Sequence, residues 1–401
     1  MYKQNFPENL KYSYIYIIVF LDLVGISLII PVLGTHLRSI GASHFQVALL
    51  SSTYSALQFL SGTFIGALSD KYGRKNILLL TLSICALAYF VLGIIKSFVL
   101  IAVVRLIQGC VKHTQLLCKI LINDIVPPEQ QTAAYGCMNG FAALSFIIGP
   151  IVGGHLMEKN EGFYILACCT AIVFLLNVLV IWLTVPNTLV ILNPKTLNKN
   201  IKNSSPFNDL LEVDWKECWP AFSLKMLGAA SMFAYYNSVS LAIKEKFSLS
   251  PSEAGYTGAI QGFTGGITGF SAGSIEHLFM FKNPFSKCYY SFFLLGTGFC
   301  TLALSPTVTI FTLALIPITI SSTLLRGYNN EILYEISSVD HRGLIAGAGA
   351  SVTAISRFIS PLLCGLTMDI FGSSSGFILS AIFAFAGAFL SKMLSKKSKN
   401  D

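Results

Sequence analysis

Several polar side chains with the chemistry to bind protons or solutes lie inside long apolar runs of the first half of the sequence. They are Asp22, in the run 13–34, and Arg105, Gln108, Lys112 and His113, in the run 98–122. An ionisable group within a membrane span costs about 2.5 to 3.5 kcal/mol on insertion scales, so it usually faces a partner or a watery cavity. These residues therefore form the candidate site.

Asp22 and Arg105 are predicted to lie at similar depths, because the two runs cross the bilayer in opposite directions. At a rise of 1.5 Å per residue, each side chain is roughly 10 to 14 Å from its membrane face. Burial disfavours an ionised carboxylate, whereas a cationic partner favours it. Asp22 is therefore the candidate protonation site, with a proton taken up or released when its pairing with Arg105 changes. The alternative is a static salt bridge that orders the bundle.

Arg105, Lys112 and Lys119 are spaced seven residues apart, which places them on nearly one face of a helix, close to Gln108. If this basic stripe faces a central cavity, it favours a small-molecule substrate that is anionic or zwitterionic. The alternative is that Lys119 extends to the headgroups and only Arg105 and Lys112 are buried. His113 can titrate near physiological pH, or can be a packing residue.

The second half of the chain also supplies ionisable residues at polar positions within or next to its apolar runs. They are Lys225, Arg326, Glu331, Glu335 and Arg357. Pairing of Arg326 with Glu331, or proximity of Glu331 to Glu335, is expected near one mouth of the bundle, in a gate or a structural contact.

The composition shows which elements must position these residues. The chain has 401 residues, 54% hydrophobic and 11% charged, against roughly 25% charged in a soluble domain. This excludes a water-soluble enzyme and makes the lipid bilayer the expected solvent. Beyond the first span at 13–34, runs of spanning length fall at 45–69, 77–95, 98–122, 134–156, 163–185, 218–242, 253–275, 285–304, 307–334, 343–371 and 375–394. Their continuous apolar character is typical of helices and argues against alternating barrel strands.

The predicted fold is an all-α polytopic membrane protein with twelve transmembrane helices in two pseudo-symmetric six-helix bundles. We expect bundles at 1–186 and 217–394, a cytoplasmic linker at 187–216 and a tail at 395–401. Sixteen Lys and Arg residues fall on the side of the two termini and five on the other side. Because basic residues are retained on the cytoplasmic side of short loops, both termini are predicted to be cytoplasmic. Plasma membrane and acidic organelle both remain open.

Other classes of function find no support in the sequence. The net charge of +8 is spread over short loops and ends, which does not indicate nucleic-acid binding. The ten cysteines lack metal-type spacing and are interpreted as packing residues. Phosphate-binding, zinc and nucleophile motifs are absent. We therefore expect no enzyme activity, no metal and no cofactor.

A short polar loop between the second and third runs forms a candidate conformational latch. Its residues are Gly66, Asp70, Gly73, Arg74 and Lys75. Gly73 permits a tight reversal, because glycine tolerates positive φ. Asp70 can pair with the nearby cations and release them as helices move. The alternative is an ordinary positive-inside loop.

The fifth run carries a motif of small residues around a proline. Its residues are Gly140, Gly149, Pro150, Gly153 and Gly154. Small residues allow helices to approach closely, and proline frees a backbone carbonyl and bends the helix. The motif predicts a helix bend, or alternatively a plain packing face.

Taken together, these two motifs resemble those of the major facilitator superfamily: the loop at 66–75 resembles its signature loop, and residues 140–154 its antiporter motif. Residues 20–33, with Asp22, Gly25 and Pro31, resemble the opening helix of its tetracycline-resistance-type, drug:proton antiporter branch. The resemblance covers the whole chain, with its specific motifs at 20–154.

The fourth run adds two further similarities. Arg105-Leu-Ile-Gln108-Gly109 is similar to the family's Arg-x-x-Gln-Gly, and Lys112-His113-Thr114 with residues 123–127 is similar to an animal orphan subgroup. Bacterial drug exporters tend not to carry the Lys112-His113 pair, and residues 273–277 are only a weak echo of the signature loop.

The resemblance implies a secondary active transporter of a small organic solute that works by alternating access and is coupled to protons. The competing class is a transporter-like membrane receptor or scaffold without transport activity. Charged residues in a buried site favour transport, because a scaffold has no evident need for them.

Overall fold

The structure, a computed structural model, describes residues 12–186, 215–278, 283–336 and 342–397. The predicted linker at 187–216 lies almost entirely outside these residues, as do the last residues of the predicted tail. The side chains of Glu276 and His277, in the weak echo of the signature loop, are also outside the described part.

The described residues of the first sequence half are helical over nearly their whole length. The helices are α1 (Ser13–Ser39), α2 (His44–Tyr72), α3 (Arg74–Ile94), α4 (Phe98–Val111), α5 (Thr114–Ile125), α6 (Pro128–Met157) and α7 (Gly162–Thr184). Those of the second half are α10 (Trp215–Phe247), α11 (Pro251–Leu278), α12 (Pro284–Leu304), α13 (Val308–Ile336), α14 (Arg342–Phe371) and α15 (Ser375–Lys397). Since α4 and α5 share one apolar run, the described residues form twelve helices in this count, and the predicted all-α fold is confirmed.

The apolar character of these helices suits a bilayer. Eight helical segments of the described chain are long and apolar enough to cross a membrane by length and composition, with α4 and α5 counted as one segment. Large apolar side chains such as Phe64, Phe90 and Leu304 are exposed on the helix surfaces. In water this much exposed apolar area would be unfavourable, so lipid is the natural surrounding of these faces.

The fourth predicted span differs from expectation, because it is broken. α4 ends at Val111 and α5 begins at Thr114. Lys112 has φ −79° and ψ 82°, and His113 has φ −127° and ψ 20°, so neither residue is helical. The expectation of one continuous helical stripe through Arg105, Lys112 and Lys119 was therefore wrong.

The chain forms two compact units. The first contains Met1–His36, Leu60–Asn193 and Ser250–Phe263, and the second contains Leu37–Phe59, Pro194–Leu249 and Thr264–Asp401. The units follow the two sequence halves with two exceptions. The beginning of α2 belongs to the second unit, and the beginning of α11 belongs to the first.

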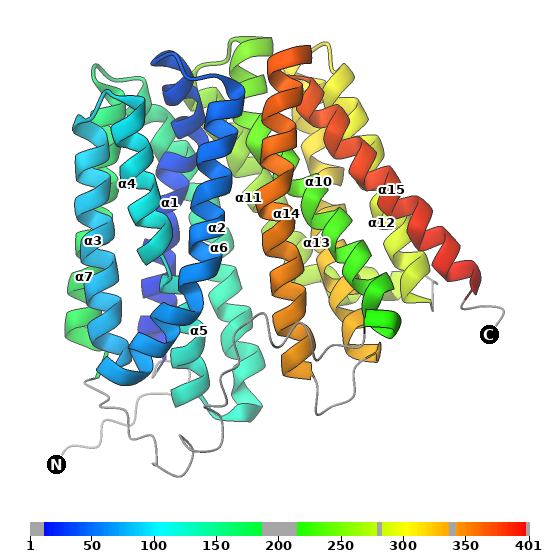
Figure 1. Ribbon diagram of the computed structural model, residues 1–401, viewed down its shortest axis with the longest axis horizontal. Helices are drawn as coiled ribbons and strands as arrows, with labels where there is room; N and C mark the ends of the chain where they lie inside the picture. Colours follow the sequence, from blue (N-terminus) through cyan, green and yellow to red (C-terminus); the bar gives the residue numbers. More distant parts are fainter. Residues whose placement is uncertain (1–11, 187–214, 279–282, 337–341, 398–401) are drawn as a thin grey trace. The chain divides into compact units, whose positions relative to one another are not determined.

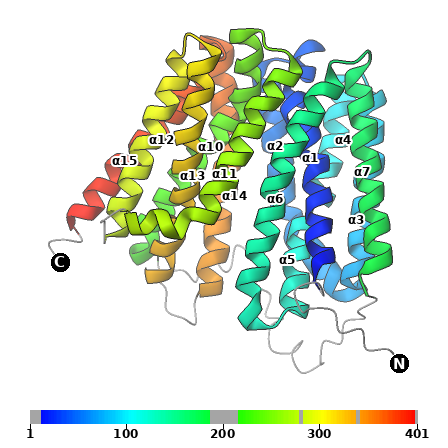
Figure 2. The same cartoon turned by 180° about the vertical axis from the view of Figure 1, so that it is seen from behind.

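Each unit has a tightly packed helix pair, which both views show side by side (Figure 1 and Figure 2). In the first unit, α3 packs against α7. A Cβ atom on Gly93 would lie 2.8 Å from the Cβ of Ala167, and the rings of Tyr89 and Phe174 stack 5.1 Å apart. In the second unit, α12 packs against α15, where Gly387 leaves room for the ring of Phe292. Close backbone approach at small residues is typical of membrane helix pairs.

Candidate functional site

Asp22 of α1 forms a buried ion pair with Lys112, at the break between α4 and α5. The side chains are only 1% and 4% exposed. The Lys112 ammonium also lies 3.3 Å from the Thr114 hydroxyl and 4.7 Å from the centroid of the Phe174 ring. Arg105 was the expected ion-pair partner of Asp22, but in the structure the partner is Lys112. Because the chain leaves the helix at Lys112, its side chain is not held in the register that a continuous helix would impose.

Arg105 lies one turn from Gln108, and both side chains are buried. The guanidinium donates a hydrogen bond to Gln108 Oε1 at 2.9 Å. Among the described residues, Gln108 Nε2 and Asp22 Oδ2 are buried without a hydrogen-bond partner. A buried polar atom without a partner is costly. The Asp22 oxygen is suited to a proton or a hydrogen-bond donor, and the Gln108 amide is suited to an acceptor such as a water molecule or a polar group of a ligand.

His113 is also buried, and its Nε2 lies 2.8 Å from the hydroxyl of Ser61 in α2. A Cβ atom on Gly62 would lie 3.5 Å from the imidazole Cε1, which is an ordinary van der Waals contact. Lys119, by contrast, is exposed in the middle of α5. The structure therefore agrees with the alternative in which only Arg105 and Lys112 of the basic stripe are buried.

The segment 66–75 was expected to be a loop, but it is the end of α2 and the start of α3, with only Gly73 between them. It contains a set of ion pairs around Arg74. This guanidinium pairs with Asp70 one turn before it and, through Nε, with Asp124 Oδ2 at 2.9 Å. It also donates a hydrogen bond to the Ser69 hydroxyl. Arg74 is 11% exposed, but Asp70 and Asp124 are 51% and 43% exposed. The pairs thus join α2, α3 and α5 in a setting where water can compete, so their net stabilisation is small.

Two further residues of this segment have a defined structural role. Gly73 has φ +91°, a conformation that side chains with a Cβ rarely adopt, and it separates α2 from α3. The Lys75 ammonium donates a hydrogen bond to the backbone carbonyl of Trp182 at 2.8 Å, near the end of α7. Cations at a helix C-terminus are favoured by the helix dipole. Gly66 has no neighbouring atom within 4 Å of an added Cβ among the described residues.

The glycines of α6 allow two other helices to approach its backbone. A Cβ on Gly149 would collide with Ser27 of α1, and one on Gly153 would lie 2.5 Å from the Leu28 carbonyl oxygen. On another side, Gly154 approaches the backbone of Pro251, at the start of α11. Gly140 is half-buried.

Pro150 lies inside α6 and has no N–H to donate to the carbonyl of Phe146. That carbonyl oxygen faces α11, where a Cβ on Gly262 would lie 2.8 Å from it. The freed carbonyl and the glycine therefore coincide at a close helix contact.

We expect Gly153→Ala to destabilise the protein by about 1 to 3 kcal/mol, because the new methyl group would overpack the α1–α6 contact. Gly136→Ala on the same helix is the matched control, since no described neighbour lies within 4 Å of its added Cβ. That control should be neutral or slightly stabilising, because alanine favours a helix over glycine. Unfolding in mixed micelles measures both variants, and equal effects would contradict the proposed close contact.

In the second half, Glu331 of α13 pairs with Lys287 of α12, with Nζ to Oε1 at 3.1 Å. The sequence had suggested that Glu331 pairs with Arg326 or lies near Glu335. Arg326 instead donates a long hydrogen bond of 3.4 Å to the Thr323 hydroxyl. The side chain of Glu335 lies outside the described residues. Lys287 is buried in the first turn of α12, where a carboxylate partner offsets its desolvation.

Sequence reasoning did not select several residues that contact the site. They are Ser61, Thr114, Asp124 and Phe174. Asp124 carried a usable signal, because it follows the fourth run at the same predicted membrane face as Arg74. Phe174 had none, since it is one apolar residue in an apolar run.

Comparisons with known proteins agree with this architecture. The model of the Major Facilitator Superfamily matches residues 15–361. The quinolone resistance protein NorA of Staphylococcus aureus (strain MRSA252) is 25% identical over 379 residues, covering 90% of this chain and 91% of that protein. The tetracycline resistance protein, class H, of Pasteurella multocida is 33% identical over 172 residues, but this covers only 41% of this chain and 42% of that protein.

Solved structures show the same fold. The human organic anion transporter MFSD10 (TETRAN) superposes with a TM-score of 0.68 at 19% identity, covering 96% of this chain and 100% of that one. The nucleoside transporter NupG superposes with a TM-score of 0.77 at 15% identity, covering 96% of this chain and 99% of that one. The family model matches most of the length of this chain, so this chain belongs to the major facilitator superfamily of membrane transporters.

Proposed function

We propose that this protein is a secondary active transporter that moves a small organic solute across a membrane by alternating access and is coupled to protons. The observation that carries the proposal is the buried Asp22–Lys112 ion pair, in which Asp22 Oδ2 has no hydrogen-bond partner among the described residues. A carboxylate with one oxygen paired to a cation and the other unpartnered can accept a proton without first breaking a hydrogen bond.

Proton binding at Asp22 would change the electrostatics of the site. Protonation neutralises the carboxylate, which weakens its attraction for Lys112 and leaves the buried ammonium available to another anion. With Asp22 ionised, the buried side chains of Asp22, Lys112 and Arg105 already sum to one positive charge. This excess of cations supports an anionic or zwitterionic substrate, whose binding would be favoured when Asp22 carries a proton. Gln108 and His113 would add uncharged hydrogen-bonding groups.

We infer that the Arg74 ion pairs act as the conformational latch. In one state of the transport cycle, this latch would hold α2, α3 and α5 together. Its residues are Asp70, Gly73, Arg74 and Lys75, with Gly66 one turn earlier in α2. Because these pairs are partly exposed, they could break and reform at small cost. The glycines and Pro150 of α6 would permit the accompanying helix movement.

The proposal also covers the orientation of the protein, its membrane and its partners. Both termini would be cytoplasmic, as the distribution of basic residues indicates. A plasma membrane and an endosomal or lysosomal membrane both suit coupling to protons. The protein would be no enzyme and would need no cofactor, because transport by this mechanism draws on ion or solute gradients. Nucleic acid is not expected as a partner.

The test is transport by the purified full-length protein in liposomes, with pooled metabolites followed by mass spectrometry, with and without a pH gradient. We expect at least one solute to accumulate only when the gradient is present, and that solute to carry a negative or zwitterionic charge. Protein-free liposomes are the control for leakage. A solute that equilibrates regardless of pH would contradict proton coupling. No movement of any solute would instead favour a receptor or scaffold.

A further inference from the structure

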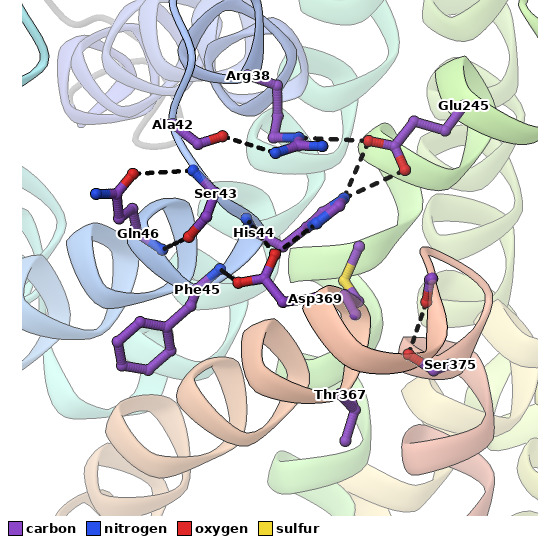
Figure 3. Close-up of polar contacts among 12 residues, drawn as sticks. Arg38, Ala42, Ser43, His44, Phe45, Gln46, Glu245, Thr367, Asp369 and Ser375 are labelled. Atoms are coloured by element: carbon purple, nitrogen blue, oxygen red, sulfur yellow. Dashed lines mark hydrogen bonds and ion pairs between the residues drawn. The ribbon is translucent and has the colours of Figure 1, made fainter.

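His44, the first residue of α2, lies between two carboxylates within the second unit (Figure 3). Its Nδ1 is 2.9 Å from Asp369 Oδ1, near the end of α14, and its Nε2 is 3.0 Å from Glu245 Oε1, near the end of α10. The imidazole side chain is 9% exposed, whereas the two carboxylates are each about one-third exposed. None of these residues belongs to the site around Asp22.

Both carboxylates are held by other donors as well (Figure 3). The backbone N–H groups of His44 and Phe45 donate to the two oxygens of Asp369, at 2.9 and 3.0 Å. Asp369 therefore caps the N-terminus of α2, where the helix dipole favours an anion. The Arg38 guanidinium, near the end of α1, lies 3.4 Å from Glu245 Oε1 and donates to the Ala42 carbonyl. Each carboxylate therefore has a hydrogen-bond donor or a cation beside it in addition to His44.

Each ring nitrogen of His44 lies within hydrogen-bond distance of a different carboxylate. An ionised carboxylate only accepts hydrogen bonds, and neutral imidazole has a single N–H, so a neutral ring would direct a lone pair at one carboxylate. Only the imidazolium donates from both nitrogens. With His44 and Arg38 cationic and Asp369 and Glu245 anionic, the charges of the cluster balance.

We propose that His44 is a proton-binding site, in which an imidazolium bridges Asp369 and Glu245 and joins the start of α2 to α10 and α14. The charged groups that the structure places against it are Asp369 of α14 and Glu245 of α10, with Arg38 of α1 behind Glu245. A metal ion is not the ligand, since the described residues contain no group of three His, Cys, Asp or Glu side chains able to hold one.

The bound proton would make this contact sensitive to pH. Loss of the proton removes one charge-assisted hydrogen bond and leaves a net negative charge in the cluster, which weakens the attachment of α2. In the predicted topology, the cluster lies on the membrane side opposite the termini. Any role in the transport cycle rests on the proposed function, but proton binding itself does not.

The experiment is nuclear magnetic resonance of the full-length protein in lipid nanodiscs, with ¹⁵N-labelled histidine side chains and His44 assigned through His44→Gln. The nitrogen shifts distinguish a doubly protonated ring from either neutral tautomer. At pH 7.5 we expect the doubly protonated form at His44. His113 and His155 serve as internal controls, because their Nε2 atoms face hydroxyl groups of Ser61 and Tyr256, which can donate or accept.

Asp369→Asn and Glu245→Gln are the matched variants, since each keeps the side-chain shape and removes one negative charge. We expect each to lower the ratio of protonated to neutral His44 at fixed pH by about tenfold or more. An unchanged His155 signal would show that the variants remain folded. A neutral His44 ring in the unsubstituted protein would overturn the proposal even if neither variant folds. These readouts need no transport, so their failure is distinct from failure of the liposome assay.

Discussion

Lys112→Met is expected to destabilise the protein by about 3 to 5 kcal/mol, which is the largest stability effect that we predict for a single substitution. The reason is the Asp22 carboxylate, which is 1% exposed and would lose its cationic partner. The methionine side chain has a similar length, so lost packing contributes little. Equilibrium unfolding in mixed micelles at constant pH measures the change in free energy of unfolding.

The double variant Asp22→Asn with Lys112→Met separates the ion pair from other effects of the substitution. A neutral pair needs no compensation of charge, so the double variant should recover most of the stability lost in Lys112→Met. The coupling energy is the difference between the double variant and the sum of the single variants. Additive losses would contradict a direct interaction between Asp22 and Lys112.

The helices were predictable because their signal is local. Each apolar run of about 20 residues or more specifies a helix by its own composition. Every predicted run corresponds to helix in the structure, apart from the break at Lys112 and His113. Even Gly73, which ends α2 with positive φ, could be identified, because only glycine adopts that conformation without strain. Element ends moved by a few residues, since polar first and last turns extend beyond the apolar run.

The break at Lys112 and His113 was not predictable from local sequence. Neither residue is a proline or glycine, the usual causes of an interrupted helix. The break coincides with two tertiary contacts. Lys112 pairs with a carboxylate 90 residues earlier in the chain, and His113 contacts Ser61 in another helix. The expected depth of each residue in the membrane consequently led to the wrong partner for Asp22.

The cluster around His44 shows the same limit more strongly. Its two carboxylates are separated from His44 by 201 and 325 residues in sequence. Each of the three lies at the end of a helix, where polar residues are expected and carry no special signal. The count of charges along the sequence covered only Lys and Arg residues and did not include these three. Only the packing of α2 with α10 and α14 brings them together.

Asp22→Asn is expected to abolish accumulation driven by the pH gradient, while leaving movement of the solute down its own gradient. Asparagine keeps the size of the side chain and cannot take up a proton, so the energy of the gradient can no longer reach the solute. For one coupled proton, a gradient of one pH unit supports about tenfold accumulation, since 1.4 kcal/mol corresponds to a factor of ten. In the variant this ratio should fall to one.

The measurement is the ratio of internal to external solute at steady state, in liposomes that carry the same amount of folded protein. Glu253→Gln is a suitable control, because this exposed carboxylate accepts a hydrogen bond from the Ser250 backbone and lies away from the buried pair. It should retain the full accumulation ratio. If Asp22→Asn also retained that ratio, the Asp22–Lys112 pair would be a structural contact and the coupled proton would have to bind elsewhere, with His44 as the next residue to substitute.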